Sequence, residues 1–225
     1  MLERLADEIP RFFTWGNLVL LGEAMGITLS MTLIGCVLGF VFAFIIAFTR
    51  QVPGIATLPL RTVAILFVEI FRRIPFLVVL FLVLFFIQAV ARGTSLFTVA
   101  VVSICIYSTA YIADIIRGGF ESVPRQQIEA ARAMNFSHLQ ILGSVIVPQS
   151  WPVILPPAVA FMVGFIKDTS LVSQIGVFEL TFRARELNNM GFSGILVFGI
   201  IAFLYFAISY PLTRWGQWLE KRLER

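Results

Sequence analysis

The order of apolar and polar positions along the chain predicts several membrane-spanning helices. A helix that crosses the hydrocarbon of a bilayer needs roughly 17 to 25 mostly apolar residues. Five runs of that kind cover residues 27–48, 75–91, 95–116, 145–166 and 192–213. Two further apolar segments, 57–73 and 171–180, are too charged or too short to span. We expect the first to form a helix at the membrane interface and the second a re-entrant or interfacial segment.

The composition agrees with a polytopic membrane protein. Of 225 residues, 59% are hydrophobic and 13% charged, and the mean hydropathy is +0.92, all outside the usual range of soluble domains. One His and two Cys are too few for a haem pair, a His/Cys zinc site or a disulfide framework. We therefore expect a single all-α transmembrane domain over residues 1–225. The acids in its first residues, MLERLADEIP, are atypical of a cleaved signal peptide.

Basic residues orient the five spans. Cytoplasmic loops carry the excess of Lys and Arg, and an odd number of spans places the termini on opposite sides. With the C-terminus inside, eleven of the 17 basic residues are cytoplasmic: Arg50, Arg61, Arg72, Arg73, Arg117, Arg125, Arg132, Arg214, Lys221, Arg222 and Arg225. The N-terminus is then outside. The net charge of +4 reflects this loop bias and membrane lipid contact, so we expect no nucleic acid partner.

A moderately polar stretch, QQIEAARAMNFSHLQILGSVIVPQ, separates the third and fourth spans on the cytoplasmic side; we refer to residues 120–148 as the 120–148 loop. Pro124 suits the start of a helix, and the residues after it are helix formers. Asn135 is well able to adopt the left-handed conformation that ends a helix. Ser137 and Gln140 have the spacing of a capping box. The loop is therefore predicted to be a short helix, a sharp turn and a second helix that enters the membrane.

The same loop resembles the EAA loop of bacterial ABC importer permeases. That pattern is EAA, three residues, Gly, nine residues, then Ile, any residue, Leu-Pro, and here EAARAMN at 129–135 is followed by VIVP at 145–148, with Asn in place of the glycine. Three other stretches look like those of the polar amino acid uptake permeases: EIFRRIPFL, AYIADIIRGG and GFIKDTSLVSQIGVFEL. The likeness extends over roughly residues 20–215. It implies a type I ABC importer transmembrane fold in the bacterial cytoplasmic (inner) membrane.

The resemblance also implies partners and a substrate class. In this family the short helix of the EAA loop docks on a separate ATP-hydrolysing subunit, which points to Gln127, Glu129, Ala130, Ala131, Arg132 and Asn135 as coupling residues. The expected partners are two ATP-binding subunits, a second permease, identical or homologous, and an extracytoplasmic solute-binding protein. ATP and Mg would be bound by the ATPase, because this chain has no G-x-x-x-x-G-K-[ST] loop. The substrate would be a polar amino acid or a related small solute.

Several residues are candidates for lining the transport pathway: Tyr111, Asp114, Lys167, Asp168, Thr169 and Ser170. Lys167 and Asp168 interrupt the apolar register after the fourth span, where charges face either a cavity or, by snorkelling, the interface. Asp114 is also spaced to form an ion pair with Arg117, and Glu69 is spaced to pair with a nearby arginine, either of which would anchor a span end.

Other readings of the chain remain. Gly35, Gly39, Ala43 and Ala47 form a ridge of small residues that favours close helix packing more than a function. An intramembrane hydrolase is disfavoured, since the only histidine, His138, lies in the 120–148 loop and no Gly-x-Ser-x-Gly elbow occurs. An ion-coupled secondary transporter or a passive channel is the alternative to an importer. Neither would explain a docking helix at this spacing.

Overall fold

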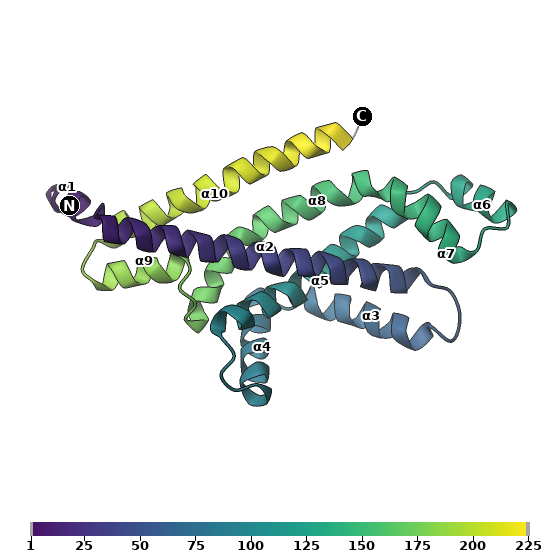
Figure 1. The fold of residues 1–225 in the computed structure, drawn as a ribbon, viewed down its shortest axis with the longest axis horizontal. Coiled ribbons are helices and arrows are strands. Elements are labelled where there is room, and N and C mark those ends of the chain that lie inside the picture. Colours follow the sequence, from purple (N-terminus) through teal and green to yellow (C-terminus); the bar gives the residue numbers. More distant parts are fainter. Residues whose placement is uncertain (1, 224–225) are drawn as a thin grey trace.

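The computed structural model describes residues 2–223, with side chains from Leu5 onward, and the elements in this range are helices. The molecule is elongated (Figure 1). Helix α1 (Leu2–Phe12) and helix α9 (Leu180–Asn189) lie at one end, and α6 (Arg125–Ala133) lies at the other. This arrangement agrees with an N-terminus and a 120–148 loop on opposite sides of a membrane.

Four helical stretches are long and apolar enough to cross a membrane, and each contains all or nearly all of one predicted run. They are α2 (Trp15–Gln51), α5 (Leu96–Glu121), the continuous stretch His138–Ile175, and α10 (Gly194–Leu223). The third of these consists of α7 (His138–Ile141), the π-helical turn η1 (Leu142–Ile146), α8 (Val147–Asp168) and the 3₁₀ helix η2 (Thr169–Ile175).

The remaining predicted span differs from expectation. Helix α4 (Phe76–Val90) has 15 residues, fewer than the roughly 17 that a span requires. It follows α3 (Leu58–Phe71) after a short break before Pro75, and the two helices are bent by 117°. A fifth span exists only if this pair is counted as one broken crossing. A helix does form within the 57–73 segment, as α3, and it packs against α2 and α5; its place at the membrane interface stays a prediction.

Helices α2 and α5 make the most extensive contact in the described chain. A Cβ atom added at Gly39 would lie 1.9 Å from Oγ of Ser108, and one added at Gly35 would lie 2.6 Å from Ile104. The hydroxyl of Ser108 donates to the carbonyl of Gly35 at 3.2 Å, and that of Thr109 donates to Gly39 at 3.3 Å. The predicted small-residue ridge is therefore confirmed as a packing surface.

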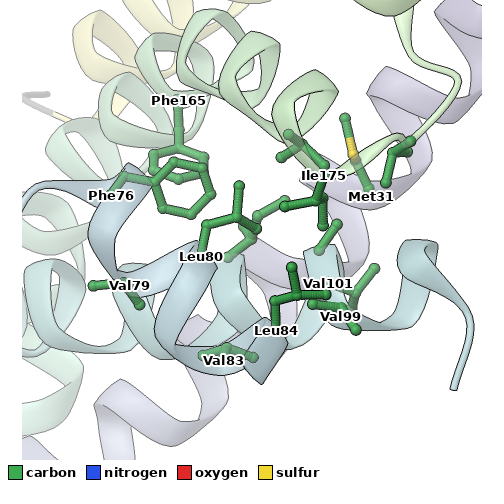
Figure 2. Packing of buried hydrophobic residues seen from close by; sticks show 14 of the residues in the cluster. Met31, Phe76, Val79, Leu80, Val83, Leu84, Val99, Val101, Phe165 and Ile175 are labelled. Carbon is green, nitrogen blue, oxygen red and sulfur yellow. The ribbon is translucent and has the colours of Figure 1, made fainter. Parts of the chain in front are cut away.

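A second core joins α4 to α8, η2 and α2. Figure 2 shows Phe76 and Leu80 of α4 facing Phe165 of α8, with Ile175 of η2 and Met31 of α2 beside them. The rings of Phe76 and Phe165 meet edge to face with their centroids 4.9 Å apart. The 171–180 segment, expected as re-entrant or interfacial, thus contributes buried side chains to the helix bundle. Its 3₁₀ helix ends at Gly176, whose φ is +90°.

Candidate functional site

The 120–148 loop adopts the helix and turn that its sequence predicts. Pro124 stands at the start of α6, and its fixed φ of −58° suits that position. After α6, Asn135 has a φ of +60° and is the only residue other than glycine with a positive φ in the described chain. The N–H of Phe136 then donates to the carbonyl of Ala131 at 3.1 Å, which closes the turn.

The predicted capping box follows the turn directly. The Ser137 hydroxyl accepts from the N–H of Gln140, and the Gln140 side chain accepts from the N–H of Ser137. This pair starts the one-turn helix α7. The π turn η1 carries the chain from there into α8, so the loop leads without interruption into a membrane span.

One face of the loop is anchored to the bundle by apolar contacts. Ala131 is 1% exposed and packs with Ile141, Leu142 and Ile146, in a cluster that also includes Ala47 of α2. Of the predicted coupling residues, Ala131 is thus turned toward the bundle, and its side chain is not free to contact a partner. A side chain larger than Ala at position 131 would separate α6 from the helices beneath it.

The opposite face of α6 is open to solvent. Gln127, Glu129, Ala130, Arg132 and Asn135 are all exposed. Within the described residues, the side chains of Gln127, Glu129 and Arg132 make no hydrogen bond or ion pair with the chain itself. Met134, Phe136 and Leu139 add exposed apolar surface nearby. The loop thus presents unpaired polar groups beside apolar ones, which is the composition of a protein-binding surface.

Tyr111 and Asp114 lie together on α5, opposite the end of α3. Asp114 binds Arg72 at 2.7 Å and Arg117 at 2.8 Å, and the Tyr111 hydroxyl donates to the backbone carbonyl of Arg72 at 3.1 Å. The Arg73–Glu69 pair closes at 2.7 Å. The pairings of Asp114 with Arg117 and of Glu69 with an arginine are confirmed. The bond between Arg72 and Asp114 joins two helices and was not predicted.

The residues predicted at the end of α8 separate into different environments. Lys167 and Ser170 line a cavity of about 530 Å³ together with Thr181 of α9, and with Tyr205 and other residues of α10. Asp168 is exposed and is not among the residues that line this cavity. Thr169 is fully buried, and its hydroxyl donates to the carbonyl of Ile166 at 2.6 Å. Thr169 is therefore a packed residue in this conformation, and its part in a pathway stays a prediction.

Glu179, beside this cavity, was missed by the sequence analysis. Its side chain is fully buried and accepts from the Tyr205 hydroxyl at 2.8 Å and from the N–H of Phe182 at 2.7 Å. Burial raises the pKa of the Glu179 carboxyl, although these hydrogen bonds oppose the shift. An acid inside the apolar 171–180 segment was the available signal, since such a residue needs partners from elsewhere in the fold.

Comparison with known proteins identifies the family. Residues 39–225 match the family described as "Binding-protein-dependent transport system inner membrane component". The chain belongs to this family. It is accordingly a multi-pass protein of the inner membrane, and members of the family are the permeases to which the 120–148 loop was compared.

The relatives include several amino acid permeases. The chain is 37% identical over 168 residues to the L-cystine transport system permease protein TcyB of Bacillus subtilis, covering 74% of this chain and 72% of TcyB. It is 32% identical to the probable glutamine permease GlnP of the same organism, covering 69% of this chain and 72% of GlnP. It is 31% identical to the amino-acid permease YhdY of Escherichia coli, and the matched region covers 72% of this chain but only 46% of YhdY.

Solved structures support the type I importer fold. A crystal structure of an amino acid ABC transporter with histidines matches with a TM-score of 0.84 and 28% identity, over 92% of this chain and 95% of the other. The inward-facing MetNI methionine ABC transporter matches with a TM-score of 0.82 and 24% identity, over 95% and 100% of the two chains. The second likeness concerns the fold alone.

Proposed function

We propose that this chain is the permease subunit of an ATP-driven importer that moves a polar amino acid or a related small solute across the inner membrane. The 120–148 loop carries the proposal. Its α6 helix is anchored through Ala131, while the polar side chains on the other face lack partners within the described chain. A helix held in place with its polar groups free is suited to receive another protein.

In the proposed arrangement, two ATP-binding subunits dock at the cytoplasmic loops of two permeases, and a solute-binding protein delivers the substrate from outside. Gln127, Glu129, Ala130, Arg132 and Asn135 form the docking surface. Ala131 holds α6 against the bundle from beneath. Closure of the ATPase pair would favour one permease conformation over the other, which is how a bound partner biases an alternating-access equilibrium.

ATP and Mg belong to the partner in this proposal. The described residues contain no group of three His, Cys, Asp or Glu side chains that could hold a metal ion. The sequence also lacks the glycine-rich loop that cradles nucleotide phosphates. This chain would therefore contribute the pathway and the docking surface, and the hydrolysis would occur in the ATP-binding subunits.

Two groups of polar side chains are proposed to line the pathway. Lys167 and Ser170 border the cavity between α8 and α10, where an ammonium and a hydroxyl could contact the carboxylate of an amino acid. Tyr111 and Asp114 form the second group with Arg72. The side chains of Arg72 and Asp114 are 37% and 23% exposed. Charges in a membrane protein avoid lipid, so we assign this face to water or to the second permease.

The substrate class rests on the relatives. Their names refer to glutamine, L-cystine and amino acids generally, and the solved transporter is described as an amino acid ABC transporter. The carboxylate of an amino acid would also suit a pathway lined by the Lys167 ammonium. We propose a polar amino acid or close analogue, with its identity selected by the binding protein.

The test is uptake in proteoliposomes that contain this chain, its ATP-binding subunits and its second permease, with the binding protein added outside. We expect accumulation of a radiolabelled amino acid that requires ATP on the cytoplasmic side and stops when the ATPase is left out. Uptake driven by a proton or sodium gradient alone would contradict the proposal and favour the secondary transporter. Equilibration without any energy source would favour a channel.

A further inference from the structure

His138 links the 120–148 loop to the first span. Its Nε2 atom lies 2.6 Å from the backbone oxygen of Gln51, across 87 positions of sequence. Gln51 is the last residue of α2, and Figure 1 places α7 beside this end of the helix. A carbonyl oxygen can only accept a hydrogen bond, so the Nε2 atom of His138 must carry the hydrogen.

The acceptor is well matched to this donor. The last four carbonyls of a helix have no intrahelical partner and carry its partial negative charge. An imidazole N–H satisfies one of them at the end of α2. Within the described residues, no other hydrogen bond and no ion pair joins the 120–148 loop to α2. Apolar side chains from both sides of this boundary, including Ala47, Ala131 and Ile141, belong to one buried cluster, and apolar contacts are not directional.

The backbone around His138 fixes its position at the point where the loop changes direction. His138 is the first residue of α7; it lies inside the Ser137–Gln140 capping box and follows the left-handed turn at Asn135. The π turn η1 follows one turn later, and single π turns within helices are frequent at functional sites. Helix α6 packs on both α7 and η1. A displacement of α6 therefore reaches α8 through the chain itself.

We infer that His138 is a positioning residue that transmits movement of α6 to the cytoplasmic end of α2. The inference rests on the proposed function, because it adds a second connection through which movement of the same coupling loop reaches the membrane spans. The chain connects α6 to α8 through η1, and the hydrogen bond from His138 connects it to α2. Both spans would then move together when the docking helix is displaced. Without the bond, α2 would follow only through non-directional contacts.

Three substitutions separate the hydrogen bond from the bulk of the side chain. In His138→Gln, the amide nitrogen stands as many bonds from the backbone as the imidazole Nε2, so the donor is kept. In His138→Asn, the amide is one bond shorter and cannot reach the same oxygen. His138→Leu has no donor. The complete importer is reconstituted in proteoliposomes with its ATP-binding subunits, second permease and binding protein, and both uptake and ATP hydrolysis are measured.

We expect His138→Gln to keep the wild-type ratio of solute imported per ATP hydrolysed. His138→Asn and His138→Leu should lower this ratio by roughly three- to tenfold, the range expected for loss of one hydrogen bond, while binding of the ATPase and hydrolysis continue. A purely structural residue would instead lower the amount of assembled complex and leave the ratio unchanged. If His138→Leu does not assemble, the Asn and Gln variants decide between these outcomes.

An unchanged ratio in His138→Asn would overturn the inference, and so would a ratio in His138→Gln as low as in the variants without a donor in reach. Loss of assembly in both Asn and Leu would also contradict it, since the bond would then hold the fold together. These results differ from failure of the proposed function, in which the wild-type complex itself shows no ATP-dependent uptake.

Discussion

Asn135 is the residue at which the 120–148 loop reverses direction, with a φ of +60°. The energy of this backbone conformation depends on which side chain stands there. Replacement by glycine removes the Cβ that makes this conformation costly. A β-branched valine keeps that Cβ and adds bulk to it. We expect Asn135→Val to destabilise the loop by roughly 1 to 2 kcal/mol, and Asn135→Gly to be tolerated.

The effect at Asn135 is measured by limited proteolysis of the loop and by ATPase binding to the purified permease. Asn135→Val should be cleaved faster and bind more weakly than both the wild type and Asn135→Gly. Equal behaviour of the Val and Gly variants would show that the left-handed turn contributes little to the shape of the loop.

Glu179 makes the stability of the extracytoplasmic end depend on pH. Burial raises the pKa of this carboxyl above its ordinary value of 4.5, so the folded protein holds the proton to a higher pH than the unfolded chain does. Stability is therefore lost as the pH rises from 4.5 through the folded pKa. We expect Glu179→Gln, which cannot ionise, to reduce the fall in melting temperature between about pH 5 and pH 8.

Melting of the purified protein in detergent, followed by intrinsic fluorescence at both pH values, measures this difference. Glu186, partly exposed and paired with Arg183, provides the control: Glu186→Gln should keep the wild-type dependence on pH. If Glu179→Gln melted with the same pH dependence as the wild type, the carboxyl would not be the group responsible.

Local signals were sufficient for Asn135, Ser137 and Gln140, because turns and caps depend on neighbours within a few residues. Glu179 could not be interpreted in the same way. Its partner Tyr205 lies 26 positions away on α10, and only the folded chain brings the two side chains together. The burial of Thr169 was also not evident from its neighbours, because only the folded chain encloses its side chain, whose hydroxyl donates to the carbonyl of Ile166.

At the scale of elements, the close contact between α2 and α5 depends on glycines, which have no side chain to hold the two helices apart. A methyl group at Gly39 would collide with the Ser108 side chain and lie in tight contact with the backbone oxygen of Cys105, 3.2 Å from the added atom. The backbone cannot move away without separating the helices. We expect Gly39→Ala to destabilise the protein by roughly 1 to 3 kcal/mol, as overpacking of a close contact usually does.

Gly26 provides a matched control on the same helix, because an added Cβ there meets nothing within 4 Å. Gly26→Ala should melt at or above the wild-type temperature, since alanine favours a helix over glycine. Thermal unfolding of both variants in the same detergent gives the comparison. Equal melting of the Gly39 and Gly26 variants would mean that α2 and α5 separate at little cost.

The periodicity of the chain located the long helices but not the bend between α3 and α4. Four of the predicted runs lie inside long helices, except for at most two residues at their starts, because a continuous apolar run is itself the property that a membrane selects. The direction of a helix after a break is set by what it packs against. Here α4 lies at 117° to α3 and packs against α5 and η2, and its Phe76 ring meets Phe165 of α8, a contact between segments far apart in sequence.

At the scale of the whole molecule, the apolar surface is larger than one chain can cover. Much of α10 is exposed, including Phe203, Phe206 and Trp215. Only 17% of its most apolar stretch is buried. Exposed apolar residues are expected where lipid or a second permease lies alongside. The end of the molecule at α6 differs from this surface, because α6 presents polar side chains there, where the proposed ATPase would dock.

Glu129 tests whether that docking surface is real. It lies past the first turn of α6, since the helix begins at Arg125, so the helix dipole contributes little to its energy. It is exposed and has no partner in the described chain. Replacing Glu129 by Lys should therefore leave the membrane fold almost unchanged. If the carboxylate meets a basic or amide group of the ATPase, the reversed charge should cost on the order of 2 kcal/mol or more at that contact.

We therefore expect Glu129→Lys to insert, and to melt at the wild-type temperature, but to lose ATPase association and transport together. Asp7→Lys is the control: Asp7 is exposed on α1, at the other end of the molecule, so this variant makes the same change of charge away from the loop and should retain ATPase binding. Association is measured by co-purification of the ATP-binding subunit, and transport by uptake in proteoliposomes. Normal co-purification and uptake with Glu129→Lys would mean that the 120–148 loop only connects two spans, because a docking helix cannot tolerate a reversed charge at its contact.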